Sequence, residues 1–341
     1  MQISKLFYPG IFLISVIMIT PGCHKDNTTT QIDVKTTSGS FIGQGWATLN
    51  GTVNAAGSQA IVSFEYDSTT TYKFEVPGNP DTITGNEVVY SRAGIQGLKP
   101  NKSYNFRIKV ITPDGILYGS NATFTTSKTT KSYTVFNPSL TYGSVSDIDG
   151  HTSKTIKIGT QTWMAENLRS TKYNDGTNIP FLNYPSDWSQ VSTSPGYSWY
   201  NNDSVDYGGL YNYYVISYAV NNNKNVCPAG WHVASDSEWG QLSDYLGGES
   251  VAGSKMKETG ITHWTSPNSS ATNVSGFTAI PSGYRSASGS YNGVTKNTYW
   301  WTSSEMSTTE AYCRTINSNF NSLEKTNSYK KTGLSIRCIK D

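Results

Sequence analysis

The sequence predicts two β-rich domains in tandem, an all-β sandwich followed by an α+β domain. Charged residues make up 15% and aromatic residues 13% of its 341 positions. This mixture is poor in helix formers and rich in residues that favour strands and turns. Apolar and polar side chains alternate along several stretches of the first third, which is the pattern of half-buried strands. A helix-start signal stands in the last third, so helix is expected there too.

The first residues predict an export signal, which we place at residues 1–22. Lys5 precedes the apolar run from Ile11 to Ile19, and Cys23 follows the small residue Gly22. The run is too short to span a bilayer comfortably. The pattern resembles a bacterial lipoprotein signal, in which Cys23 becomes acylated and holds the protein on the outer membrane or cell surface. Residues 23–30 are then a polar tether; the alternative is an ordinary secretory signal in which Cys23 has no role.

Residues 31–127 predict a β-sandwich. The stretches from Gly45 to Val53 and from Ala60 to Ser68 alternate apolar and polar side chains. Gly, Pro and Asn punctuate these runs at the short spacing typical of sandwiches. The clearest alternation places one set of side chains on a single strand face: Tyr104, Phe106, Ile108 and Val110.

The end of this domain resembles the last strands of a fibronectin type III domain. The stretch is "GLKPNKSYNFRIKVITPDGILYGSNATFTTS", residues 97–127. Leu98, Pro100 and Tyr104 match the corner motif of that family, in which the tyrosine hydroxyl ties down a loop. The resemblance implies a spacer or binding module. Residues 128–144 are polar and are expected to be a linker to a second domain at 145–341.

The stretch "CPAGWHVASDSEWGQLSDYLGG", residues 227–248, concentrates polar side chains but predicts a capped helix. Ser235 and Glu238 have the spacing of a capping box, which satisfies the first backbone N–H groups of a helix. We expect the helix to run from Asp236 to about Leu246, where two glycines end it. Its buried face would comprise Trp239, Leu242 and Leu246. These polar groups therefore indicate scaffold and no catalytic triad.

Several motifs together resemble the Fibrobacter succinogenes major paralogous domain. They are "TIKIGTQTWMAENLRSTKYNDGTNIP" (155–180), "CPAGWHVASDSEW" (227–239), "YWWTSSE" (299–305) and "LSIRCIKD" (334–341). The resemblance covers almost all of residues 145–341. It implies an exported or surface lipoprotein of a Bacteroidetes-like bacterium, in a family without an established biochemical function.

A more distant similarity implies the fold of this second domain. "GWHVASDSEWGQL" is similar to a segment of formylglycine-generating and sulfatase-modifying domains, which have a C-type-lectin-like α+β architecture. The catalytic cysteine pair of those enzymes has no match here. In that architecture a cysteine near the first helix pairs with one on the final strand, in agreement with a disulfide between Cys227 and Cys338. Cys313 is then expected to be a free, buried thiol.

Long loops rich in aromatic residues are the candidate binding surface of the second domain. Flat aromatic faces suit sugar rings, and neighbouring polar groups suit sugar hydroxyls. The candidate ligand-binding residues are His263, Trp264, Tyr284, Arg285, Trp301 and Glu305. Candidate oxygen ligands for calcium are Glu258, Asn268 and Asn273. The alternative is that the aromatics build the core and that Asn and Ser make loop turns.

These observations predict a lipid-anchored envelope protein whose lectin-like domain binds an extracellular glycan or protein. We expect no enzyme activity and no cofactor, with calcium left open. The net charge of +2 provides no basic field for nucleic acid. Two alternatives remain: a polysaccharide-active enzyme, for which Glu258 and Glu305 are the candidate carboxylate pair, and a structural subunit of a surface assembly.

Overall fold

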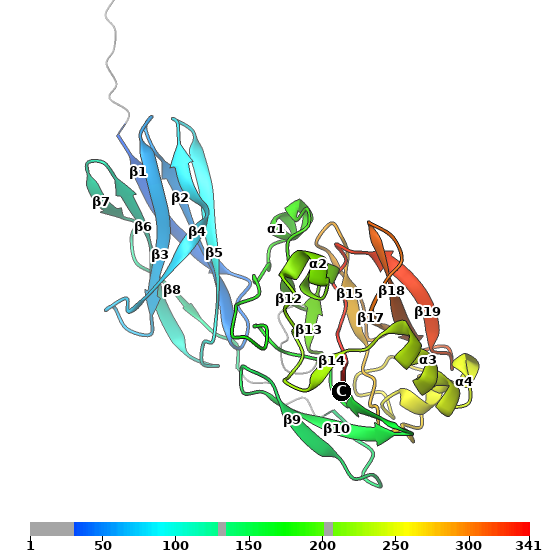
Figure 1. Ribbon diagram of the computed structural model, residues 1–341. Coiled ribbons are helices and arrows are strands. Elements are labelled where there is room, and N and C mark those ends of the chain that lie inside the picture. Colours follow the sequence, from blue (N-terminus) through cyan, green and yellow to red (C-terminus); the bar gives the residue numbers. More distant parts are fainter. Residues whose placement is uncertain (1–30, 129–133, 201–206) are drawn as a thin grey trace, which may run out of the picture. The chain divides into compact units, whose positions relative to one another are not determined.

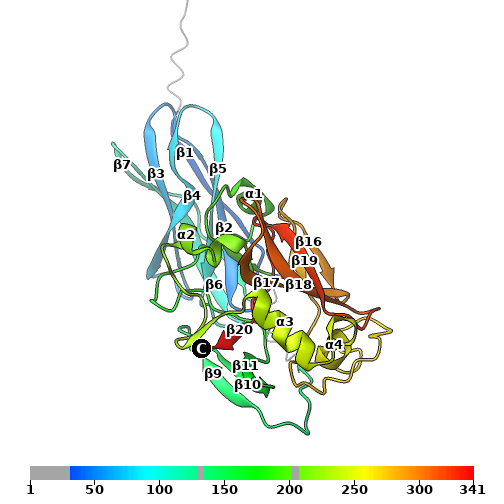
Figure 2. The ribbon, with the colours of Figure 1, turned by 45° about the vertical axis from the view of Figure 1, so that its right-hand side comes forward.

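The computed structural model describes residues 31–128, 134–200 and 207–341. The predicted signal and the whole predicted tether, Cys23 included, lie outside the described residues. Figures 1 and 2 show the helices and strands of the described residues. Ile32–Asp341 form one compact unit, which contains three hydrophobic cores. One of these cores belongs to a β-sandwich, and the other two are built mainly by residues after 135.

The N-terminal part is an antiparallel β-sandwich. Its strand order is β1-β2-β5-β4-β3-β6-β7, and β8 also pairs with β6. β4 joins the two sheets, because it pairs with β3 along most of its length and with β5 at a single residue pair. The strands are β1 (Asp33–Ser40), β2 (Trp46–Asn54), β3 (Gln59–Asp67), β4 (Phe74–Thr84), β5 (Val88–Gln96), β6 (Ser103–Thr112), β7 (Gly115–Tyr118) and β8 (Ala122–Thr125).

The alternation in the sequence correctly predicted these strands. In β6 the even-numbered residues from Tyr104 to Val110 are buried, and the odd-numbered ones between them are half-buried. The Tyr104 hydroxyl accepts a hydrogen bond from the Lys99 backbone N–H at 2.9 Å. The loop tie expected from the corner motif is therefore confirmed.

The region expected to be a linker contributes apolar side chains to the second domain. Phe136, Leu140 and Tyr142 pack against the core that contains Trp163, Trp239 and Trp300. The Lys154 ammonium lies 4.0 Å from the centre of the Phe136 ring. These residues are therefore packed parts of the second domain.

The second domain combines three small sheets with short helices. One sheet has the order β14-β20-β11-β10-β9, another is the pair β12-β13, and the third has the order β16-β15-β17-β18-β19. The strands are β9 (Gly143–Ser146), β10 (Thr152–Ile158), β11 (Gln161–Met164), β12 (Tyr197–Trp199), β13 (Gly209–Tyr211), β14 (Trp231–Val233), β15 (Ser282–Arg285), β16 (Tyr291–Val294), β17 (Asn297–Glu305), β18 (Glu310–Asn317), β19 (Glu324–Tyr329) and β20 (Cys338–Lys340). The helices are α1 (Pro185–Gln190), η1 (Tyr213–Val215), α2 (Tyr218–Asn221), α3 (Asp236–Tyr245) and α4 (Glu249–Met256). Among the described residues, no helix has the length and apolarity needed to cross a membrane.

Two features join distant segments of this domain. Cys227 and Cys338 form a disulfide that links segments 111 residues apart and fixes the start of β20, which confirms the expected pairing. Cys313 is free and buried, also as expected. The fully buried guanidinium of Arg337 donates to the backbone carbonyls of Met164, Phe277 and Thr278 at 2.8–3.1 Å. These bonds hold the loop at Phe277 and Thr278 against the end of β11 and the segment before the final strand.

Candidate functional site

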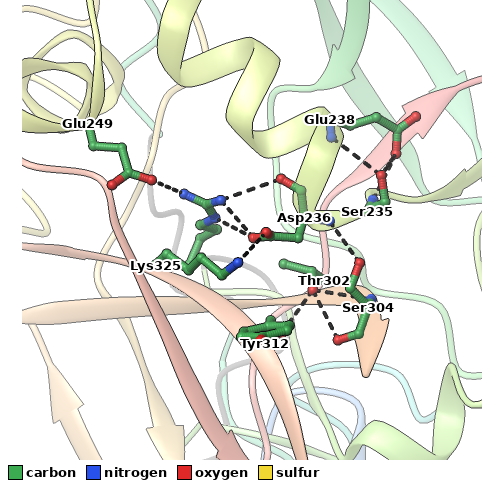
Figure 3. Close-up of polar contacts among 9 residues, drawn as sticks. Ser235, Asp236, Glu238, Glu249, Thr302, Ser304, Tyr312 and Lys325 are labelled. Carbon is green, nitrogen blue, oxygen red and sulfur yellow. Dashed lines mark hydrogen bonds and ion pairs between the residues drawn. The ribbon is translucent and has the colours of Figure 1, made fainter. Parts of the chain in front are cut away.

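The polar residues at the start of α3 form a capping network (Figure 3). The Ser235 hydroxyl accepts from the Glu238 backbone N–H at 3.3 Å, and the Glu238 carboxylate accepts from the Ser235 N–H at 2.7 Å. Asp236 accepts from Arg314 at 2.6 Å and from Lys325 at 2.7 Å. The predicted helix and its capping box are confirmed, and both carboxylates lie in the first turn, where the helix dipole favours negative charge.

His232 lies beside this cap without activating a nucleophile. Its Nε2 is 2.8 Å from a Glu238 oxygen, and its Nδ1 is 2.6 Å from an oxygen of Asp341. The Ser235 hydroxyl donates to the other Glu238 oxygen at 2.8 Å. A serine nucleophile needs its hydroxyl proton directed at a base that is itself available. Here the imidazole bridges two carboxylates, so the arrangement ties the helix start to the C-terminal strand.

Four of the residues predicted to contact a ligand are enclosed in the domain. Trp264 and Trp301 are 1% and 0% exposed, and their ring N–H groups donate to the carbonyls of Ala279 and Tyr211. His263 is buried and contacts Glu258 at 2.7 Å. Arg285 is fully buried, and burial lowers its pKa to about 10. None of these side chains presents a face to a surface ligand.

Arg285 organises a loop from inside the domain. Its guanidinium donates to the backbone carbonyls of Leu182, Asn183 and Gly289. It also lies 4.6 Å from the centre of the Trp188 ring. A planar guanidinium can donate several hydrogen bonds in fixed directions. Arg285 therefore satisfies the hydrogen-bonding capacity of these loop carbonyls from inside the domain.

The three candidate calcium ligands are buried; oxygens of Glu258 and Asn273 are bonded to protein groups, while the Asn268 side-chain oxygen has no partner among the described residues. The Glu258 carboxylate accepts from the Val135 N–H and contacts His263. Asn268 donates to the carbonyls of Glu258 and Gly260 at 2.9 and 2.7 Å. The side chain of Asn273 exchanges two hydrogen bonds with Thr278. These side chains connect loop segments, which corresponds to the turn-forming alternative.

Glu305 remains at the surface but does not face Glu258 across a cleft. Its carboxylate is 3.0 Å from Lys330 and accepts from the Ser217 hydroxyl at 3.1 Å. Glu258 is 0% exposed and its oxygens are occupied inside the domain. A glycosidase needs two carboxyl groups that both reach the scissile bond. This pair therefore does not provide such a site.

An open groove lies over the third sheet, and we call it the tyrosine groove. Its volume is about 420 Å³. That volume falls in the range of about 300–1,000 Å³ that is usual for small-ligand sites. The groove is lined by Tyr284, Ser286, Ala287, Tyr299, Cys313, Thr326, Asn327, Ser328, Tyr329, Thr332 and Leu334.

The tyrosine groove combines aromatic walls with uncharged hydrogen-bonding groups. Tyr284 and Tyr299 meet edge to face, with ring centres 5.4 Å apart. Tyr329 is 63% exposed, while Cys313 and Leu334 beneath the groove are buried. Burial raises the pKa of the Cys313 thiol to about 12, so this sulfur stays protonated and is a poor nucleophile. The groove is chemically suited to binding.

Sequence reasoning identified one residue of this groove, Tyr284. Tyr299 begins the family motif "YWWTSSE" and was not among the predicted ligand-binding residues. Tyr329 ends the polar segment "EKTNSY", whose alternating burial marks an edge strand with one exposed face. This alternation is seen only in the structure, because the residues before Tyr329 are all polar and show no alternation in the sequence. In this sheet Tyr299 lies opposite Thr315 of β18 and Tyr329 lies opposite Glu310, so the two tyrosines line different ends of the groove.

A second polar cluster follows β9. Asp147, Asp149 and His151 offer ligand atoms within 4.8 Å of one another, a spacing that suits a metal ion. The carboxylates are already bonded within the chain. Asp147 accepts from the His151 N–H at 2.9 Å, and Asp149 accepts from the Thr171 N–H and hydroxyl. The hydrogen bonds from His151 and Thr171 therefore explain this cluster as a turn that is stabilised within the chain.

Comparison with known proteins identifies the class of the second domain. The profile of the Fibrobacter succinogenes major domain matches residues 156–340, more than half of the chain. The chain belongs to this family, as its motifs predicted. No curated protein sequence matches it.

Two solved structures show limited similarity. The sensor domain of the anti-sigma factor RsgI4 in Pseudobacteroides cellulosolvens is 23% identical, with a TM-score of 0.24. The match covers 29% of this chain and 96% of that one. The third fibronectin III domain of human KIAA0343 protein is 11% identical, with a TM-score of 0.19. That match covers 33% of this chain and 96% of the human domain.

Proposed function

We propose that the second domain is a lectin-like module that binds an extracellular glycan in the tyrosine groove. The observation that carries the proposal is the composition of the groove, which joins three tyrosines to hydroxyl and amide side chains without any charged residue. The faces of sugar rings pack on aromatic side chains, while their hydroxyls need hydrogen-bond partners. An uncharged lining favours a neutral glycan over an acidic one, because no cation compensates the desolvation of a carboxylate.

In this proposal the chain is anchored to the cell envelope through Cys23, and the β-sandwich carries the binding domain away from the membrane. The support is the lipoprotein-like signal in the sequence and the order of the modules. Metabolic labelling with a palmitate analogue tests the anchor. Wild-type protein should be labelled and should fractionate with membranes, whereas Cys23→Ser should lose both properties. Labelling that survives this substitution would argue against the anchor.

A glycan array tests the binding site, using soluble protein from His24 onward. We expect binding to a neutral glycan and about a two- to tenfold loss of affinity in Tyr329→Ala, since an aromatic contact contributes about 0.5–1.5 kcal/mol. Tyr329 is 63% exposed, so its removal should leave the fold intact. The matched control is Tyr218→Ala on α2, where a tyrosine 54% exposed lies outside the groove.

The two variants separate the groove from the rest of the surface. Equal affinities of Tyr329→Ala and wild type for every bound glycan would place binding elsewhere. Absence of binding across neutral glycans would contradict the ligand class. Equal losses in the Tyr329 and Tyr218 variants would indicate a general effect of losing surface tyrosine.

A further inference from the structure

A second cavity lies within the compact unit, between the β2–β5 edge and the loops that follow β9 and β11. Its volume is about 510 Å³. Trp46 and Trp199 line it with ring centres 6.0 Å apart, and Gln96 adds an amide. The Gln96 side-chain oxygen accepts from the Tyr197 hydroxyl, which orients the amide N–H groups away from that contact. We call this space the arginine cavity, after the residue that distinguishes it.

The charged residues that line the arginine cavity differ in whether they contact a group of opposite charge. Lys172 pairs with Asp149 at 3.2 Å, and His151 pairs with Asp147 at 3.1 Å. Arg169 also lines the cavity but has no carboxylate within 4.0 Å among the residues that the structure describes. Arg169 is therefore a cation of the lining that no carboxylate of the described residues contacts directly.

The guanidinium of Arg169 is also short of hydrogen-bond acceptors. Its Nε is buried without an acceptor, and one terminal nitrogen makes a long 3.4 Å bond to the Thr152 carbonyl. A buried donor without a partner costs about 1–3 kcal/mol, more when it is charged. A guanidinium presents parallel N–H groups that match the two oxygens of a carboxylate. The site is therefore incomplete without an acceptor, and a carboxylate fits it best.

We propose that the arginine cavity binds a carboxylated sugar of monosaccharide or disaccharide size. Arg169 holds the carboxylate and Gln96 contacts hydroxyls, while the buried Trp46 and Trp199 form part of the cavity wall. The cavity differs from the tyrosine groove in having a cation, and it shares no lining residue with it. The proposal does not depend on glycan binding in the groove.

Matched sugar pairs test the charge preference. Affinities of the protein from His24 onward for galacturonate and galactose, and for glucuronate and glucose, are measured by calorimetry at low ionic strength. Each pair differs in the carboxylate alone. We expect at least one uronate to bind about tenfold or more tightly than its neutral partner, the range expected for a charge-assisted bond. Arg169→Gln should bring this ratio close to one, whereas Lys157→Gln, which removes an exposed charge on β10, should leave it unchanged.

A chemical probe locates the site in wild-type protein, so that the test does not rest on the folding of a variant. Phenylglyoxal modifies accessible arginines, and mass spectrometry reads each position. The preferred uronate should protect Arg169, and the neutral sugar should not. Uronates that bind no better than neutral sugars, or that leave Arg169 fully reactive, would overturn the proposal. A preference that persists in Arg169→Gln would also overturn it.

Discussion

The β-sandwich and the second domain are stabilised in different ways. The sandwich core consists of apolar side chains from facing strands, and none of the charged residues described in 31–127 is buried. The second domain buries seven Lys, Arg, His or Glu side chains among its described residues. They are Lys257, Glu258, His263, Arg285, Arg314, Lys330 and Arg337.

The difference follows from how much regular structure each domain has. A strand satisfies its backbone N–H and C=O groups in its own sheet. Long loops leave backbone carbonyls that must find donors when they are buried. Lys257 illustrates the solution: its ammonium donates to the carbonyls of Ser269 and Phe320 at 2.8 and 2.9 Å. In the second domain, buried cations therefore donate to backbone carbonyls that sheet pairing would satisfy in the sandwich.

The largest expected loss of stability comes from replacing Arg337, a fully buried cation that donates to three backbone carbonyls. Arg337→Met has a similar volume but leaves the carbonyls of Met164, Phe277 and Thr278 without their donor. We expect a loss of about 3–5 kcal/mol in the free energy of unfolding, as for several unsatisfied buried groups together. Urea denaturation followed by tryptophan fluorescence measures it, because eight of the nine tryptophans lie after residue 140.

The control for this prediction is Lys157→Met, which removes an exposed cation on β10. Its unfolding should stay within about 0.5 kcal/mol of wild type. If Arg337→Met proved equally mild, buried cations would not stabilise the loops and the contrast between the two domains would fail.

A somewhat smaller effect is expected from removing the disulfide. Cys227→Ser with Cys338→Ser opens a link between residues 111 positions apart. In the chain-entropy account such a loop contributes at most about 4.8 kcal/mol, and strain and residual structure in the unfolded chain reduce the expected loss to about 2–4 kcal/mol. The fluorescence transition should move to lower urea, and the double variant should respond no further to reductant. Retention of the wild-type midpoint would mean that the loops are held without the covalent link.

The smallest effect concerns His232. Burial opposes its charged form, but hydrogen bonds to Asp341 and Glu238 outweigh burial and raise its pKa above the usual 6.5. A raised folded-state pKa stabilises the fold below about pH 6.5, and this contribution is lost as the pH rises through the folded-state value. His232→Gln should therefore be less stable than wild type at pH 5.5, by under about 1 kcal/mol because the partners are partly exposed. The gap should narrow at pH 9, and a gap that widens there would show that the imidazole acts while neutral.

Much of the fold was predictable because its signals are local. Alternation located the strands of the sandwich, and the spacing of Ser235 and Glu238 located α3 with its cap. The candidate site was predicted less well. Trp264 and Trp301 occur in loop-like and strand-like contexts that suit a binding surface, but both are enclosed. The identity of an aromatic residue does not indicate whether its face of the strand will be covered by other parts of the fold.

By itself the sequence determined the β-rich class, the family of the second domain, the capped helix and the pairing of Cys227 with Cys338. These follow from periodicity, short-range spacing and motif matches. The tertiary structure decided which polar groups are buried and which aromatics remain open. The tyrosine groove joins residues from β15, β17 and β19, and the arginine cavity joins residues more than 100 positions apart. Exposure and charge balance depend on every neighbour in space, so no local pattern could specify them.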